Sequence, residues 1–187
     1  MSARTERAIL EATSELLAEH GLREITIDAV AARARVSKAS VYRRWPSKGT
    51  LAFDAFVTEF LERQPLPDTG DLRHDLELVL GGWVRAVRDT TTGRTLKGLI
   101  AEVQRDPGLA EAWQERFVKP VRERLGLVIQ RAVARGELQP GVDGALLLDL
   151  LFGPAYHRLL HGHLPLDARF VRGVVEAVMA GVGAGAV

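Results

Sequence analysis

Apolar residues recur every three or four positions along most of the chain, which is the period of an amphipathic α-helix. Near the N-terminus Ala8, Ala12 and Leu16 follow this spacing and predict a helix over residues 5–20, with Gly21 behind it as a typical C-cap. Together with helix-capping residues, the same spacing predicts further helices over residues 26–33, 37–44, 48–63, 72–88, 95–105, 108–135, 144–161 and 168–180.

The pattern predicts an all-α protein of about nine helices. No run of alternating apolar and polar residues lies between hairpin turns, so we expect no β-sheet. Residues 64–70, QPLPDTG, hold two prolines and a glycine and cannot continue a helix. We therefore expect two domains, residues 1–64 and residues 65–187.

Residues 26–45 have the features of a helix-turn-helix, the motif that places its second helix in the major groove of DNA. Thr26 and Ser37 are good N-caps for its two short helices. Small residues such as Ala32 and Ala39 would let these helices approach closely. The second helix carries side chains of the kinds that reach bases and phosphates, namely Lys38, Ser40, Tyr42, Arg43 and Arg44.

The distribution of charge supports this interpretation, although the net charge is only +1. Between Asp28 and Asp54 there is no acidic residue. The same stretch holds Arg33, Arg35, Lys38, Arg43, Arg44 and Lys48. A short basic segment on an otherwise balanced chain is typical of a phosphate-binding surface. The alternative is a solvated helix face.

The stretch that begins at Thr26, TIDAVAARARVSKASVYRRWPSKGTL, resembles the DNA-binding domain of TetR-family regulators. The resemblance covers about the first third of the chain. It implies a homodimer on a double-stranded DNA operator, most often as a repressor that responds to a small molecule. The residues that it implies for phosphates are Thr26, Ser37, Tyr42 and Lys48, and those for the groove floor are Lys38, Ala39, Ser40 and Arg43.

The turn of the motif departs from the family pattern at Arg35, where the family usually has glycine. A non-glycine residue in the left-handed conformation costs about 1 kcal/mol. We expect the charge of Arg35 to offset this strain by contacting a phosphate. Trp45 is expected to pack in the core.

The second domain is expected to hold an unidentified small apolar effector, because of the resemblance and because this region has no other evident task. The alternative for each candidate residue is that it simply fills the core. The candidates are Trp83, Leu99, Val103, Trp113, Phe117 and Val121 as apolar lining, with Tyr156 and His157 as polar groups.

The last two predicted helices carry more apolar residues than one chain can cover. We expect them to form a four-helix bundle with the same helices of a second copy. Gly153 would permit close approach of the backbones. The expected interface residues are Leu146, Leu150, Gly153, Val171, Val174 and Val178.

Other functions find less support in the sequence. His157 and His161 have the i, i+4 spacing of paired metal ligands, but histidines near a helix end also serve as caps or surface contacts, so we expect no metal. There is no cysteine and no motif of catalysis or cofactor binding, so neither an enzyme nor a cofactor is expected. A helical adaptor would leave the basic segment unexplained. The N-terminus lacks an apolar signal sequence and the apolar stretch 145–156 is too short to cross a membrane, so we expect a cytoplasmic protein without membrane contact.

Overall fold

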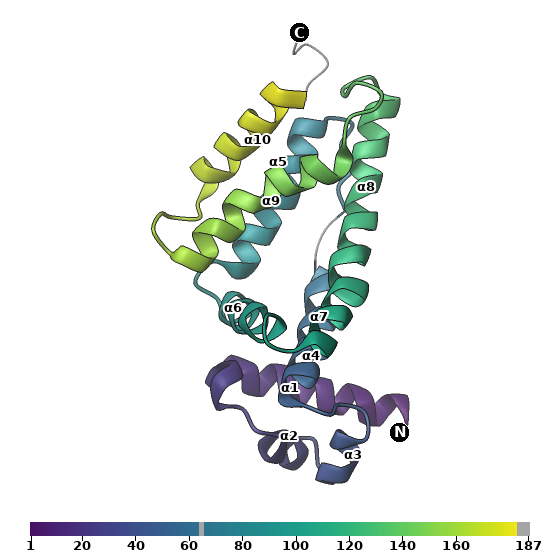
Figure 1. Cartoon of the computed structure of the whole chain (residues 1–187), viewed down its shortest axis with the longest axis vertical. Helices are drawn as coiled ribbons and strands as arrows, with labels where there is room; N and C mark the ends of the chain where they lie inside the picture. The colour runs from purple at the N-terminus through teal and green to yellow at the C-terminus, as the bar shows by residue number, and fades with distance from the viewer. Residues whose placement is uncertain (64–65, 183–187) are drawn as a thin grey trace. The chain divides into compact units, whose positions relative to one another are not determined.

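The structure is a computed structural model that describes residues 1–63 and 66–182 (Figure 1). These residues form helices and no β-strand, which confirms the predicted all-α class. The helices are α1 (Ala3–Glu24), α2 (Ile27–Arg33), α3 (Lys38–Tyr42), α4 (Lys48–Arg63), α5 (Leu72–Val87), α6 (Thr91–Val103), α7 (Pro107–Trp113), the π-helical segment η1 (Gln114–Val118), α8 (Lys119–Ala134), α9 (Gly144–His161) and α10 (Ala168–Val182).

Side-chain caps define the N-termini of the short helices, as the sequence predicts. The Thr26 hydroxyl accepts a hydrogen bond from the Ala29 amide at 3.1 Å, and the Ser37 hydroxyl accepts one from the Ser40 amide at 3.2 Å. Each cap satisfies one amide that the first helical turn leaves unpaired. Gly21 interrupts α1 with a φ of +75°, which agrees with its predicted role as a helix stop.

The helix predicted over residues 108–135 is interrupted by η1, which the sequence did not predict. Pro120 has no amide hydrogen, and in a regular α-helix its ring would clash with the carbonyl of Arg116. A π turn holds one extra residue and relieves that clash without ending the helix. The preceding helix α6 also starts earlier than predicted, because Thr90 caps it through the Gly93 amide at 3.0 Å.

The described residues group into two compact units. The first unit contains α1 to α4, α6, α7 and η1 up to Phe117, and in it α1 packs against α4 and α6. The second unit contains α5, α8, α9 and α10, and in it α5 packs against α10 and α8 against α9. The domain division at residues 64 and 65 stays a prediction, and these two residues lie outside the described part of the chain.

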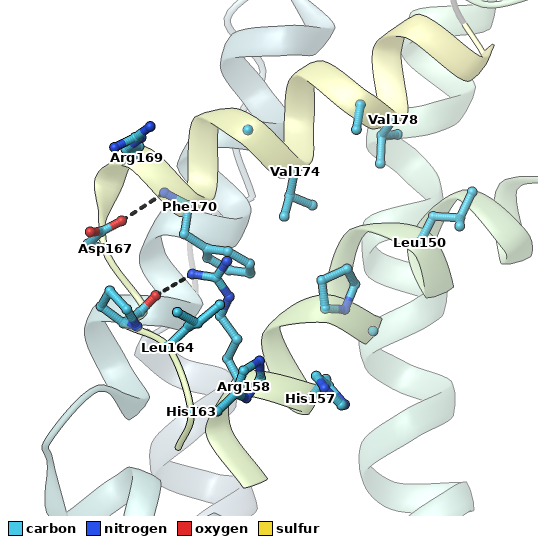
Figure 2. Close-up of a pocket in the computed structure, with 15 residues that line it drawn as sticks. Leu150, His157, Arg158, His163, Leu164, Asp167, Arg169, Phe170, Val174 and Val178 are labelled. Atoms are coloured by element: carbon cyan, nitrogen blue, oxygen red, sulfur yellow. Dashed lines mark hydrogen bonds between the residues drawn. The ribbon is translucent and has the colours of Figure 1, made fainter. Parts of the chain in front are cut away.

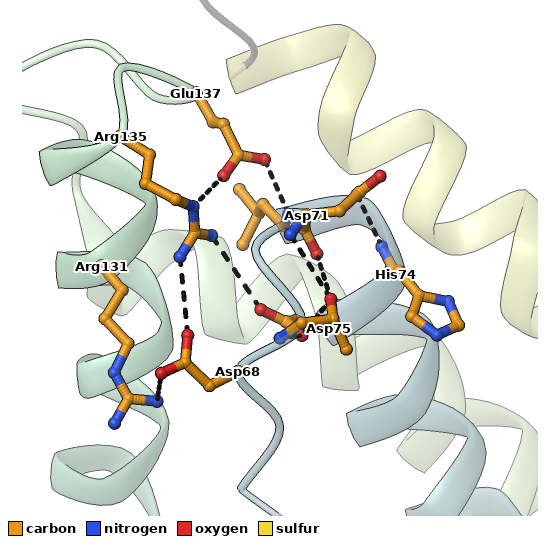
Figure 3. A network of polar contacts seen from close by, with 9 residues as sticks. Asp68, Asp71, His74, Asp75, Arg131, Arg135 and Glu137 are labelled. Carbon is orange, nitrogen blue, oxygen red and sulfur yellow. Dashed lines mark hydrogen bonds and ion pairs between the residues drawn. The ribbon is translucent and has the colours of Figure 1, made fainter.

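A buried carboxylate holds the start of α5 in the second unit (Figure 3). Asp75 is only 1% exposed, and its Oδ1 accepts hydrogen bonds from the amide and the hydroxyl of Thr69 at 2.9 and 2.8 Å. Arg135, which follows α8, lies 4.0 Å from the other oxygen. Glu137 accepts from the Leu72 amide at 2.7 Å and pairs with Arg135. The network therefore ties the first turn of α5 to the end of α8.

We expect Asp75→Ala to lower the free energy of unfolding by about 2–4 kcal/mol, because it leaves the polar groups of Thr69 and a nearby arginine without their buried partner. The control is Asp149→Ala, which removes a 63% exposed carboxylate paired with Arg122 and should cost less than about 1 kcal/mol. Urea denaturation followed by circular dichroism measures both. Equal losses in the two variants would contradict the structural role of Asp75.

Candidate nucleic-acid interface

Helices α2 and α3 form the predicted helix-turn-helix in the first unit. Ile27, Val30 and Val41 are buried between them and the neighbouring helices, as expected of the core of this motif. The turn is closed by a hydrogen bond from the Val36 amide to the Ala31 carbonyl at 2.9 Å. Arg35 has a φ of +55°, which confirms the left-handed conformation inferred from the sequence. The two helices are thus fixed by local backbone and apolar contacts.

The residues implied for DNA contact lie mainly on the surface of this motif. The exposed ones are Thr26, Arg35, Ser37, Lys38, Ala39, Tyr42 and Arg43, and the half-buried ones are Ser40 and Lys48. Tyr42 is 52% exposed, which is unusual for an aromatic side chain without a partner. A polar and aromatic surface of this kind is suited to contact with phosphates and base edges.

Ion pairs engage several of the basic side chains that the sequence grouped together. Lys38 pairs with Asp28 at 2.6 Å, and Arg44 pairs with Glu6 at 2.6 Å. Lys48 donates to the carbonyl of Arg23 at 2.9 Å.

Arg33 is bound most fully, because it pairs with both Glu15 and Glu19 of α1. Its hydrogen bond to Glu19 lowers the pKa of that carboxyl. Arg35 and Arg43 form no ion pair with any described residue, so their charges are available to an anion outside the chain.

The end of the recognition helix is anchored through Trp45. Its side chain is 1% exposed, which confirms the predicted core position, and its indole Nε1 donates to Asp54 Oδ2 at 2.8 Å. The other carboxylate oxygen of Asp54 forms an ion pair with Arg116 at 2.7 Å. The sequence analysis missed this group, although an acid inside the apolar run LAFDAFV of residues 51–57 was a signal of a buried, paired carboxylate.

The candidate effector residues fall into both units. In the first unit Leu99, Trp113 and Phe117 are buried and Val103 is half-buried. Trp113 and Phe117 belong to an aromatic cluster whose other members are Phe53, Phe56 and Phe60 of α4.

In the second unit Trp83 is buried, Val121 and Tyr156 are half-buried and His157 is exposed. The rings of Trp83 and Tyr156 lie 5.0 Å apart between centroids. Burial raises the pKa of the Tyr156 phenol to about 12, against an opposing effect of its hydrogen bond with Trp83.

An open groove of about 960 Å³ runs between α9 and α10 (Figure 2). It is lined by four of the predicted interface residues, Leu150, Gly153, Val174 and Val178. Beside it Leu146 is 54% exposed, and Leu150 itself is 48% exposed. The sixth, Val171, is buried within the chain, and so is Val178, which is 5% exposed.

Three histidine side chains gather where α9 ends. The ring centroids of His157 and His161 are 4.6 Å apart, and those of His157 and His163 are 4.9 Å apart. All three residues are exposed. No group of three or more metal-binding side chains within residues 1–63 and 66–182 is placed to hold a metal ion. Over the same residues, no helix combines the length and apolar character that crossing a membrane requires.

In comparison with known proteins, both parts of the chain match models of the same protein family. Residues 9–55 match the family of bacterial regulatory proteins called tetR, and residues 66–178 match the tetracyclin repressor-like C-terminal domain. The HTH-type transcriptional regulator YdeS of Bacillus subtilis (strain 168) is 34% identical over 96% of this chain and 90% of its own length. The DNA-binding transcriptional repressor TetR of Mycobacteroides abscessus is 32% identical over 92% of this chain and 90% of its own. The crystal structure of the TetR-family transcription regulator SCO0332 superposes with a TM-score of 0.86 at 35% identity, covering 95% of this chain and 98% of that one.

Proposed function

Because the chain belongs to the TetR family of DNA-binding transcription regulators, we propose that it is a ligand-responsive repressor that binds a palindromic operator as a homodimer. Its family and relatives are regulators and not enzymes. The observation that carries the DNA-reading part is the exposed surface around α3, where Arg35 and Arg43 form no ion pair with any residue that the structure describes. The relative from Mycobacteroides abscessus is described as a repressor, which supports that direction of control. An operator on the chromosome also implies a cytoplasmic location.

Base reading is assigned in this proposal to Lys38, Ala39, Ser40 and Arg43, and backbone contact to Thr26, Arg35, Ser37, Tyr42 and Lys48. Arg43 lies directly after α3, and its guanidinium has the fork geometry that matches the O6 and N7 atoms of guanine. To contact DNA, Lys38 must either break its ion pair with Asp28 or contact the DNA while it keeps that pair. One helix this short reads too few bases for genomic specificity, so two half-sites are required.

Substitution should separate the two kinds of contact. We expect Arg43→Ala to cost about 1–3 kcal/mol of operator affinity and to relax the base preference at one position of each half-site. Lys48→Ala should instead weaken binding to all sequences alike and flatten the salt dependence, because a lysine on a phosphate reads no base. Fluorescence anisotropy over a salt titration measures both effects, with circular dichroism as a control for folding. Unchanged affinity in both variants would contradict the assignment of this helix.

The homodimer is proposed to form through α9 and α10. Leu146 and Leu150 are roughly half exposed on α9, and Leu160 and Leu164 at and beyond its end are 47% and 52% exposed. Together with the groove these side chains make an apolar face for which a second copy is the proposed cover. Gly153 adds no side chain to the groove and lets a partner helix approach.

We expect the double variant Leu150→Arg, Val174→Arg to be a monomer with its helicity largely kept, because two charges would be buried in the proposed interface. Leu127→Arg is the matched control, since Leu127 is 43% exposed on α8 and does not line the groove. Light scattering gives the mass of each variant. A dimer mass in the double variant would contradict this arrangement.

The effector is proposed to be a small, mainly apolar molecule. Trp83, Leu99, Val103, Trp113, Phe117 and Val121 remain the proposed apolar lining, and Tyr156 and His157 the proposed polar contacts. Tyr156 supports this role because its ring lies against Trp83 and its hydroxyl can form a hydrogen bond with a polar group. The effector must prefer a conformation in which the two recognition helices no longer match adjacent major grooves. We propose that α4 transmits this conformational change to the recognition helix, since it connects the helix-turn-helix to the residues that follow.

A screen of apolar compounds by thermal shift, followed by operator competition, tests the response to an effector. We expect a stabilising compound to lower operator affinity, and a hundredfold decrease corresponds to about 2.7 kcal/mol of differential binding. Tyr156→Phe should weaken binding of a polar-tipped compound by about 0.5–1.5 kcal/mol, because it removes only the hydroxyl. A compound that depends on Tyr156 and yet leaves operator affinity unchanged at saturation would contradict the coupling.

A further inference from the structure

Asp54 is a buried carboxylate that joins two segments far apart in the sequence. Its Oδ2 accepts a hydrogen bond from the indole of Trp45, which follows the recognition helix, and its Oδ1 forms an ion pair with Arg116, which lies in η1. Both distances are short, 2.8 and 2.7 Å, and the residue is 7% exposed. All three residues belong to the first unit.

On one side of this junction, Trp45 fixes the end of α3. Its amide donates to the Val41 carbonyl at 3.0 Å, so its backbone continues the last turn of the helix. Its indole is buried and held by Asp54 of α4. The position of the last turn of α3 relative to α4 therefore depends on this hydrogen bond.

On the other side, the register of η1 places Arg116. The guanidinium lies over the ring of Phe53 at 5.6 Å and reaches Asp54. The buried rings of Trp113 and Phe117 flank it in sequence and pack against each other, tilted by 52° with their centroids 4.7 Å apart. A π turn holds one residue more than an α turn, so loss of the π turn would rotate the residues on one side by about 100°.

The two sides are linked by the energetics of a buried charge. The Arg116 side chain is 53% exposed, whereas the Asp54 carboxylate is 9% exposed. If Arg116 moved away, Asp54 would keep its buried charge with only the indole as a partner, which is unfavourable. The carboxylate would then have to move towards water or another donor and would release Trp45. The position of α3 thus opposes a change in the winding of η1. By the same free energy, the winding of η1 opposes a shift of α3.

We propose that Asp54 is a positioning residue that couples the winding of η1 to the recognition helix. The alternative to this winding is a regular α-helical turn, which the Pro120 ring opposes and which a change elsewhere in the helix would have to stabilise, and η1 runs without a break into α8. Any event that changes the winding of this helix is transmitted to Trp45 through the Asp54 carboxylate. The consequence for DNA rests on the proposed function, in which α3 docks on the operator.

Amide hydrogen exchange measured by NMR on the full-length protein tests the coupling without DNA. Arg116→Met removes the ion pair, and we expect exchange of the Arg43, Arg44 and Trp45 amides to rise about fivefold or more relative to the amides of α1. Arg116→Lys keeps a charge at this position and should restore most of the protection. Arg105→Met, which removes an exposed arginine of the same unit, should leave exchange unchanged.

The reciprocal change is Trp45→Phe, which keeps a ring but removes the indole donor and should speed exchange in residues 114–118. If Arg116→Met is too unstable, the double variant Asp54→Asn, Arg116→Met leaves no unpaired carboxylate and should show the same loss of protection at the end of α3. Unchanged exchange at Arg43 to Trp45 in these variants, with faster exchange confined to η1, would overturn the proposal.

A DNA duplex selected from a random pool by the unaltered protein provides the second measurement. We expect the duplex to slow exchange in residues 114–118 of the unaltered protein and not of Arg116→Met, whose affinity should fall about fivefold or more. Binding of the duplex without any effect on η1 would overturn the coupling while leaving DNA reading intact. Failure to select any duplex would contradict the proposed function, whereas the measurements without DNA would still decide the role of Asp54.

Discussion

The burial of α4 on all sides is the constraint on which the first unit depends. Every residue from 51 to 57 is buried, and the helix packs against α1, α6 and α7. A helix with no exposed face over two turns cannot shift alone, because each side chain displaces a neighbour in a close-packed interior. Helix α4 therefore holds the helix-turn-helix in place. The position of α4 is itself set by contacts with the aromatic cluster and with α1.

This burial also explains why a single polar side chain of α4, that of Asp54, fixes the positions of other residues. Asp54 is the charged member of a run that otherwise holds only apolar residues. In such surroundings a carboxylate needs a partner for each of its oxygens, and the chain supplies a hydrogen bond to one and an ion pair to the other. The indole of Trp45 and the guanidinium of Arg116 are thereby held in a fixed relation that apolar packing alone would not specify.

The parts of the structure that depend on neighbours in sequence could be predicted, and those that depend on distant residues could not. Caps at Thr26 and Ser37 follow from local chemistry, and the left-handed Arg35 was implied by the family resemblance, in which glycine is usual at this position. The ion pairs of Arg33 and Arg44 could not be predicted, because their partners Glu6, Glu15 and Glu19 belong to α1 and lie outside the basic stretch of sequence. Helical spacing also cannot detect a shift of one residue, so the π turn was missed although Pro120 was its signal. Periodicity shows that a side chain such as Trp113 is buried but not against which neighbour, so the residues that surround any effector cannot be derived from it.

In the proposed homodimer the Asp54 junction would occur twice, once behind each recognition helix. A palindromic operator engages both helices at once, so the free energies of the two junctions act on the same binding event. If each junction favours the DNA-competent position by a factor of about five, the dimer gains a factor of about 25. Symmetry thus lets a modest preference in each chain produce a large change in operator occupancy. The same reasoning requires the proposed α9 and α10 interface to stay intact when α4 changes position. If that interface loosened, each chain could change conformation independently of the other, and the doubled effect would be lost.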